Sequence, residues 1–349
     1  MKRLLIIRFS AIGDVAMTIP VIYACAVDNP QLRITVLSRE FLKPLFSRMP
    51  ANVEFRGVDL KKESYRGIKG LNKLFNELKN ENFDAVADFH DVLRSKYLRY
   101  RFMLSGTRVA HILKGRKGKK QLTRERHKIM KQQKTSFQRY AEVLERLGIR
   151  ISSHFTSIFP EGKSDLSRII EITGEKGNSK WIGIAPFAAH YGKVYPYELQ
   201  EKVIKMLDKF PDTRIFIFGA GEKQLEIAKR WQNMCPRTTV SMIGKLKMDE
   251  ELILMNHLDV MLSMDSANMH LASLVNTPVV SVWGATHPYA GFMGWNQKTE
   301  DAIQTDLPCR PCSIYGNKPC IKVKPQEYCP CMSSIKPEVI VEHLKKYLN

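Results

Sequence analysis

Short apolar runs alternate with longer amphipathic segments along most of the chain. Residues 3–9 form a continuous apolar run broken only by arginines, as expected of a strand buried on both faces. Similar runs recur, and most are followed by a segment with helical spacing. This alternation predicts parallel sheets covered by helices, which is an α/β fold. The predicted strands are 3–9, 33–38, 52–58, 83–90, 107–113, 181–187, 214–221, 239–244, 260–264 and 278–285.

The helical segments and one polar stretch predict two domains. Residues 151–180 are polar and broken by proline and glycine, so we expect an N-terminal domain over 1–163 and a C-terminal domain over 164–349. Each is expected to be a doubly wound, Rossmann-like domain, with ligands in a cleft at the carboxyl ends of its strands. The predicted helices are one beginning near Pro20 and those at 63–81, 136–147, 196–210, 222–233, 249–258, 268–275 and 337–347.

The hydropathy and charge of the chain indicate where the protein is located and what kind of partner it binds. No run of eighteen apolar residues occurs, and the first apolar run is too short for a signal peptide, so we expect a cytoplasmic protein. The net charge is +20, and residues 94–139 hold sixteen Lys or Arg against one acid, Glu125. This basic stretch is interpreted either as a solvated loop or as a surface for nucleic acid or a phosphorylated membrane lipid.

Five of the seven cysteines lie between 309 and 331. The spacing Cys309-x-x-Cys312, followed by three more thiols, is compatible with a tetrahedral zinc site. Reduced thiols packed in a loop are the favoured interpretation, structural zinc is possible but not favoured, and disulfides are disfavoured in the cytoplasm.

The turn after the first predicted strand carries a carboxylate. Gly13 allows an unusual backbone or a close approach, and Asp14 follows it at the carboxyl end of the strand. Asp14 is either a general base for an attacking hydroxyl or only the cap of the next helix. A single glycine in the turn does not make a dinucleotide fingerprint.

Three turns of the second half offer groups that suit a nucleotide. Asp265, Ser266 and Ala267 precede a predicted helix, whose free N–H groups favour phosphate, and His270 lies one turn further on. A satisfied interior histidine is the alternative for His270. Two further candidates are Lys193, a loop cation suited to a diphosphate, and Glu222, a carboxylate after a glycine turn suited to ribose hydroxyls.

The order of these motifs resembles glycosyltransferase family 9, the heptosyltransferases of the lipopolysaccharide inner core. It reads SAIGDVAMTIP, GKVYP, FGAGE, IGKL, DSANMHLAS and PVVSVWGATHP, and the resemblance covers nearly the whole chain. It implies a GT-B fold, ADP-heptose as donor and transfer with inversion. It also implies Asp14 as catalytic base. The donor-binding residues it implies are Gly13, Lys193, Glu222, Asp265, Ser266, Ala267 and His270.

The resemblance also implies the partners. The acceptor is a lipid-linked core oligosaccharide, met by the N-terminal domain, and the protein lies on the inner face of the cytoplasmic membrane. We expect no metal and no cofactor to be required, since the motifs contain no Asp-x-Asp pair. Ala267 departs from the usual glycine of the donor turn. The acceptor-binding candidates are Arg94, Arg116, Lys117, Lys119 and Lys120. Alternatives are a GT-B enzyme using a UDP- or GDP-sugar and, more remotely, a nucleic-acid-binding protein.

Overall fold

The structure, a computed structural model of the protein, describes residues 1–324 and 327–348. Its contacts divide the chain into two compact units. Unit 1 comprises Met1–Lys114 and Thr135–Ile158, and unit 2 comprises Gly115–Lys134 and the chain from Phe159 onward. The chain therefore passes between the units three times, after Lys114, Lys134 and Ile158.

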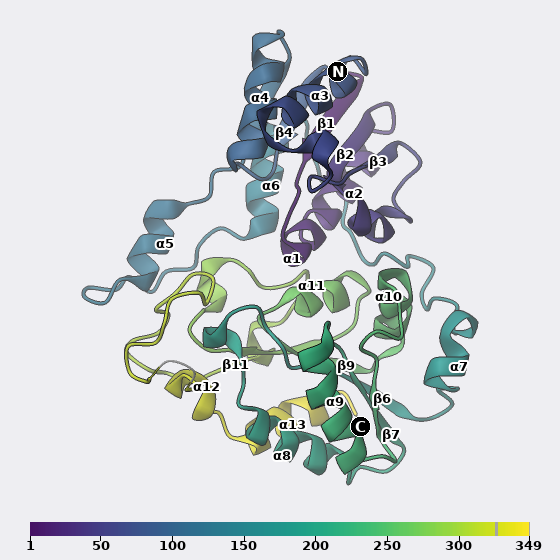
Figure 1. Ribbon diagram of the computed structural model, residues 1–349, viewed down its shortest axis with the longest axis vertical. Coiled ribbons are helices and arrows are strands. Elements are labelled where there is room, and N and C mark those ends of the chain that lie inside the picture. Colours follow the sequence, from purple (N-terminus) through teal and green to yellow (C-terminus); the bar gives the residue numbers. More distant parts are fainter. Residues whose placement is uncertain (325–326, 349) are drawn as a thin grey trace. The chain divides into compact units, whose positions relative to one another are not determined.

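Unit 1 is built on a five-stranded parallel sheet in the order β3-β2-β1-β4-β5 (Figure 1). Helices α3 and α4 lie side by side, and their buried residues join those of β1 and β4 in one core, including Leu74, Phe102, Leu5 and Val86. Helices α2 and α6 pack against one another. The strands are β1 Arg3–Ile7, β2 Arg33–Arg39, β3 Val53–Val58, β4 Ala85–Asp88 and β5 Arg108–His111. The α-helices are α1 Ile12–Ala16, α2 Ile19–Asp28, α3 Gly67–Lys79, α4 Leu93–Leu104 and α6 Ser136–Glu145, with 3₁₀ turns at Glu40–Phe46 and Glu63–Tyr65.

Unit 2 is built on a six-stranded parallel sheet in the order β11-β10-β9-β6-β7-β8. Helices α8, α9 and α13 bury their apolar residues in a core with β6, β7, β9 and β10. The strands are β6 Lys180–Ala185, β7 Thr213–Ile217, β8 Thr239–Ser241, β9 Val260–Met264, β10 Val279–Trp283 and β11 Ala302–Gln304. The α-helices are α5 Arg116–Thr123, α7 Ile170–Thr173, α8 Tyr197–Leu207, α9 Glu222–Met234, α10 Met248–His257, α11 Ala267–Leu274, α12 Pro330–Ser333 and α13 Pro337–Lys345. Short 3₁₀ turns lie at Leu166–Ile169, Tyr191–Lys193, Pro288–Ala290 and Thr299–Asp301.

Each predicted strand is present and most are shortened, but β9 has the predicted bounds, β2 is one residue longer and β11 was not predicted. The basic stretch also differs from the prediction. It contains two helices, α4 and α5, that we did not predict as helices. Residues 115–134, which we assigned to the N-terminal domain, belong to unit 2. The physical reason lies in their contacts: the Lys128 Nζ donates to the carbonyls of Cys309 (2.8 Å) and Pro311 (2.7 Å). The last boundary between the units along the chain lies between residues 158 and 159, whereas we predicted it between 163 and 164.

Within the part of the chain that the structure describes, no helix has the length and apolar character needed to cross a bilayer.

Candidate active site

In each unit the strand order reverses direction at one point, between β1 and β4 in unit 1 and between β6 and β9 in unit 2. Parallel sheets bind ligands outside the carboxyl ends of the strands at such points. Asp14 follows β1, and Lys193 and Asp265 follow β6 and β9. The two strand orders therefore place the sequence candidates at the positions where ligands are expected in this type of sheet.

Asp14 is the third residue of the short helix α1, and not a residue of an open turn before a helix near Pro20 as we predicted. One carboxylate oxygen, Oδ2, accepts the backbone N–H of Ala11 at 3.1 Å, so Asp14 caps the first turn of α1 from within and does not cap the helix near Pro20. The same oxygen pairs with the Arg8 Nη2 at 2.8 Å. The side chain of Asp14 remains 34% exposed while that of Arg8 is 9% exposed. The carboxylate is thus fixed by the buried Arg8 and by the Ala11 N–H, and it is still reachable from solvent.

Arg8 and His90 are site residues that the sequence interpretation missed. The Arg8 Nη1 donates to the Phe89 carbonyl at 2.8 Å, and the His90 Nδ1 accepts the Phe9 N–H at 3.3 Å. Burial lowers the pKa of His90 to about 3, and the nearby charge of Arg8 adds to this, opposed by Asp14. The imidazole is therefore neutral at physiological pH, and with Nδ1 accepting, its proton is on Nε2. The sequence feature that could have indicated Arg8 is a cation near the end of an apolar run that is predicted to be buried.

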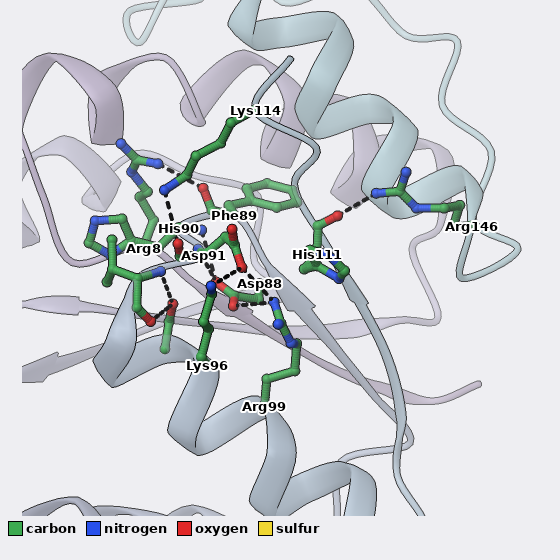
Figure 2. Close-up of polar contacts among 12 residues, drawn as sticks. Arg8, Asp88, Phe89, His90, Asp91, Lys96, Arg99, His111, Lys114 and Arg146 are labelled. Atoms are coloured by element: carbon green, nitrogen blue, oxygen red, sulfur yellow. Dashed lines mark hydrogen bonds and ion pairs between the residues drawn. The ribbon is translucent and has the colours of Figure 1, made fainter. Parts of the chain in front are cut away.

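A buried ion-pair network fixes the loop that carries His90 (Figure 2). Asp88 is fully buried, and its Oδ1 accepts the N–H groups of His90 (2.9 Å) and Asp91 (2.8 Å). Its Oδ2 pairs with the Arg99 Nη1 at 2.9 Å. The Lys114 Nζ donates to the carbonyl of Asp91, which has a φ of +50°. Such a network over-determines the backbone and holds His90 in place.

In unit 2, the predicted cation Lys193 is held by a carboxylate. Its Nζ lies 2.9 Å from the Asp265 Oδ2, and the two side chains are 15% and 5% exposed. The aliphatic stem of Lys193 packs on Gly316, where an added Cβ would lie 2.7 Å from the Lys193 Cγ. Lys193 is therefore a positioned cation and not a mobile loop lysine. The positive charge stands directly beside the start of α11.

The start of α11 provides the remaining predicted donor groups. Ser266 is the N-cap in an extended conformation without a side-chain cap, and Ala267 is the first helical residue. His270 is buried within the same helix, 7% exposed. Glu222 is the exposed first residue of α9 and follows Gly221, which has a φ of +82°. Gly13, which we predicted as a donor-binding residue, is buried in α1 next to Asp14. It belongs to unit 1, whereas the other predicted donor-binding residues belong to unit 2.

The predicted acceptor residues belong to two different units. Arg94 is exposed on α4 of unit 1, whereas Arg116, Lys117 and Lys120 are exposed on α5 of unit 2. Lys119 is buried, and its Nζ lies 4.2 Å from the centroid of the Phe292 ring. This cation–π contact stabilises the position of α5. The Lys119 side chain is therefore not exposed for binding an acceptor.

The cysteine loop packs under the Lys193 segment. Among the described residues no group of three or more His, Cys, Asp or Glu is arranged to hold a metal ion. All seven cysteines are free thiols, with Cys329 and Cys331 buried. The buried Arg310 ties the loop to the sheet by donating to the carbonyls of Trp283 (3.1 Å) and Thr286 (3.0 Å).

Comparison with known proteins identifies one family. The family model described as glycosyltransferase family 9 (heptosyltransferase) matches residues 71–319. Lipooligosaccharide heptosyltransferase 2 of Campylobacter jejuni is 22% identical over 349 residues, which covers 96% of each chain. Lipopolysaccharide heptosyltransferase 3 of Escherichia coli is 26% identical over 307 residues, which covers 84% of each chain.

Solved structures confirm the predicted fold class, α/β with two Rossmann-like units of the GT-B type. The family 9 glycosyltransferase from Veillonella parvula has a TM-score of 0.75 at 18% identity, covering 99% of this chain and 97% of that one. The E. coli ADP-heptose lipopolysaccharide heptosyltransferase II has a TM-score of 0.72 at 16% identity, covering 99% and 98%. Since the family model spans well over half of the chain, the protein belongs to glycosyltransferase family 9, the heptosyltransferases, and is a glycosyltransferase enzyme.

Proposed function

We propose that the protein transfers heptose from ADP-heptose to a hydroxyl of a lipopolysaccharide inner-core acceptor, with inversion at the anomeric carbon. The observation that carries this proposal is the occurrence of an exposed carboxylate at one switch point and a positioned cation at the other, in a chain of the heptosyltransferase family. The E. coli structure with ADP-2-deoxy-2-fluoro heptose supports the choice of donor, since that relative aligns with 99% of this chain.

In the proposed reaction, Asp14 acts as general base. Its carboxylate takes the proton of the acceptor hydroxyl as that oxygen bonds to the anomeric carbon. The bond between the anomeric carbon and the diphosphate oxygen breaks at the same time, and ADP leaves with its electron pair. Attack on the side opposite the leaving group inverts the centre. Arg8 keeps the Asp14 carboxylate ionised and oriented.

The leaving diphosphate gains negative charge in this step. Lys193 and the free N–H groups at the start of α11 are the proposed groups that stabilise it. Glu222 is proposed to hold the ribose hydroxyls, and His270 to contact the phosphate region from within α11. The Lys193–Asp265 pair suggests that Asp265 holds the lysine in place before the donor binds.

Nucleotide specificity is the first test. Melting temperature is measured with ADP, UDP and GDP, because a ligand that binds the folded state raises apparent stability by mass action. We expect ADP to give the largest shift, and the product from ADP-heptose to have the inverted anomeric configuration by NMR. A larger shift with UDP or GDP identifies a different sugar donor and overturns the assignment of ADP-heptose.

We also propose that transfer requires no divalent cation, because Lys193 and the α11 N-terminus supply positive charge at the leaving group. Turnover is measured with and without EDTA. The expected rate is unchanged, and a large loss restored by magnesium or manganese contradicts the proposal. A slow loss restored only by zinc assigns a structural metal to the cysteine loop.

The acceptor in this proposal is lipid-linked, so the enzyme works at an anionic membrane surface on the cytoplasmic side. The net charge of +20 supports this, because cations near such a surface are attracted by about 1 kcal/mol each.

A further inference from the structure

Helix α4 has apolar residues on two opposite faces. Its inner face carries the buried residues Ser95, Leu98, Arg99 and Phe102, which recur with helical spacing. The outer face carries Leu93, Tyr97, Tyr100 and Leu104, spaced i, i+4, i+7 and i+11, so that they also form one stripe. At 100° per residue the two stripes lie on opposite sides of the helix.

The outer stripe is exposed to solvent to an unusual degree for its residue types. Leu93 is 87% exposed, Leu104 is 80% exposed and Tyr100 is 50% exposed. Met103, beside the stripe, is 46% exposed. Single exposed apolar residues need no explanation, but a continuous stripe of them indicates a binding surface.

Helix α3 extends this surface. It packs beside α4 (Figure 1), and at the seam the Tyr97 hydroxyl donates to the Asn72 Oδ1 at 2.5 Å. Ile68, one turn before Asn72 on α3, is 68% exposed. The exposed Lys69 and Lys73 stand on the same outward side of α3.

The charges around the stripe indicate what covers it. Residues 93–104 contain four cations and no acid. Arg94 is exposed on one flank of the stripe, and Lys96 lies on the other flank, 3.7 Å from the Asp91 Oδ1. Arg101 lies on the Arg94 side but is held at the seam with α3, where it donates to Asn72. An apolar stripe flanked by cations is the pattern of helices that lie in the interface of an anionic bilayer. A second copy of the chain docked through the same face would bring like charges together.

We propose that the outward face of α4, extended by Ile68 of α3, is the surface by which the enzyme docks on an anionic lipid bilayer. Leu93, Tyr100 and Leu104 enter the acyl boundary, and Arg94 meets lipid phosphates. This rests on the proposed function, which places the acceptor in a membrane. It assigns docking to apolar insertion by unit 1, and not to the cations of α5.

The test measures binding to vesicles of 30% phosphatidylglycerol in phosphatidylcholine by co-sedimentation. Leu93→Gln combined with Leu104→Gln keeps helix propensity and removes two apolar groups. We expect at least a tenfold loss of binding. The matched control is Ile321→Gln, which removes an 85% exposed apolar side chain from unit 2 and is expected to bind like the wild type.

A direct readout of insertion is Tyr100→Trp. Of the four native tryptophans, Trp181, Trp231 and Trp283 are fully buried, and Trp295 is half-buried in unit 2. The difference from the wild-type spectrum therefore reports the new residue. Its emission is expected to shift to the blue with anionic vesicles and not with pure phosphatidylcholine. No shift, or unchanged vesicle binding by the double variant, overturns the proposal. So does a self-association in ultracentrifugation that the double variant abolishes, since that assigns the face to a second copy.

The double variant is also assayed with a delipidated, water-soluble core acceptor. We expect its rate to equal that of the wild type, while its KM rises several-fold for acceptor embedded in vesicles. If the wild type fails to use either acceptor, the proposed function fails, but the vesicle binding and the emission shift still decide the docking surface.

Discussion

The carboxylate of Asp14 caps the first turn of α1 and has a proposed role as general base, and its sequence position alone does not separate the two. It caps α1 through the Ala11 N–H, and it stands beside Arg8 with a third of its surface open. A cap contributes to folding, whereas a base must be ionised and reachable. The pairing with Arg8 orients one carboxylate oxygen, and the exposed third of the side chain leaves the carboxylate within reach of an acceptor hydroxyl.

Asp14→Asn separates these two functions. Asparagine keeps the shape and the capping oxygen but does not accept a proton, so we expect turnover to fall on the order of a hundredfold or more. ADP affinity is expected to stay near wild type. The melting temperature should fall only modestly, because Asn keeps an oxygen for the Ala11 N–H but loses the charge that pairs with Arg8. Single-turnover transfer to a defined core acceptor is measured beside melting on the same samples. A variant that keeps more than about a tenth of the rate removes Asp14 from the role of base.

His90 predicts a pH dependence of stability. Its pKa is lowered to about 3 in the folded protein, from an ordinary value near 6.5, because burial and Arg8 disfavour the charged ring. Between these values the unfolded chain binds the proton and the folded chain does not. Stability is therefore full above pH 6.5 and is lost as the pH falls, by up to about 1.4 kcal/mol per pH unit.

His90→Gln removes this titration, so its melting temperature is expected to fall less than that of the wild type between pH 7 and pH 4. Melting is followed by circular dichroism. His154→Gln serves as control, since this exposed histidine should leave the wild-type slope intact. If the melting temperatures of His90→Gln and the wild type fall equally between pH 7 and pH 4, His90 is not a neutral, buried histidine.

At the scale of elements, the strands were predictable and the helices of the basic stretch were not. Most strands are short apolar runs buried on both faces, and this signal is local, whereas β3 and β5 are partly exposed. Helix α4 has apolar residues on two opposite faces, so no single stripe stands out from its sequence, and only packing shows which face is inside. Helix α1 is a single short turn whose N-cap, Ala11, is not a capping residue, and so its start carried no sequence signal.

Part of the candidate site was predictable for the same reason. Asp14, Lys193 and Asp265 directly follow strands, and parallel strands bring such positions to one edge of a sheet. The partners Arg8 and Gly316 were not predictable, because their role depends on contacts made after folding. The burial of Lys119 beneath Phe292 is a further example, since a basic run gives no sign of which cation turns inward.

Gly316 connects the cysteine loop to the proposed donor site. Its φ is +78°, and an added Cβ would lie 2.7 Å from the Cγ and 2.9 Å from the Cε of Lys193. We expect Gly316→Ala to displace Lys193 and to weaken ADP binding several-fold in calorimetry. Gly106→Ala is the matched control, because Gly106 has a φ of +84° and no atom within 4 Å of the added Cβ.

Both glycine variants are expected to lose about 1–2 kcal/mol of stability from the left-handed backbone. Only Gly316→Ala should change ADP affinity. Equal ADP affinity in the two variants and the wild type means that the loop does not position Lys193.

At the scale of the whole molecule, the chain does not divide into two consecutive domains. It leaves unit 1 at Lys114, forms α5 and the irregular segment 124–134 within unit 2, and returns at Thr135. This excursion is anchored by the Lys128 contacts with the cysteine loop and by the Gln133 N–H, which donates to the Tyr289 carbonyl at 2.8 Å. The unit that holds the proposed donor residues thus also carries the exposed cations of α5.

These cations lead to a prediction about the acceptor. Arg116, Lys117 and Lys120 are exposed on α5, and core oligosaccharides with carboxylates and phosphates would be attracted to them. We expect Arg116→Glu, Lys117→Glu and Lys120→Glu together to raise the KM for a phosphorylated soluble acceptor at least tenfold, which corresponds to about 1.4 kcal/mol. ADP affinity should be unchanged, because Lys193 and the start of α11 are untouched.

The control reverses the exposed Lys202, Lys205 and Lys209 near α8, which changes the net charge by the same amount at another place. If the two triple variants raise KM equally, the effect is the long-range field of the whole protein. If neither does, α5 is only a solvated helix. A KM effect confined to the α5 variant, and weakened by high salt, locates acceptor recognition on the excursion.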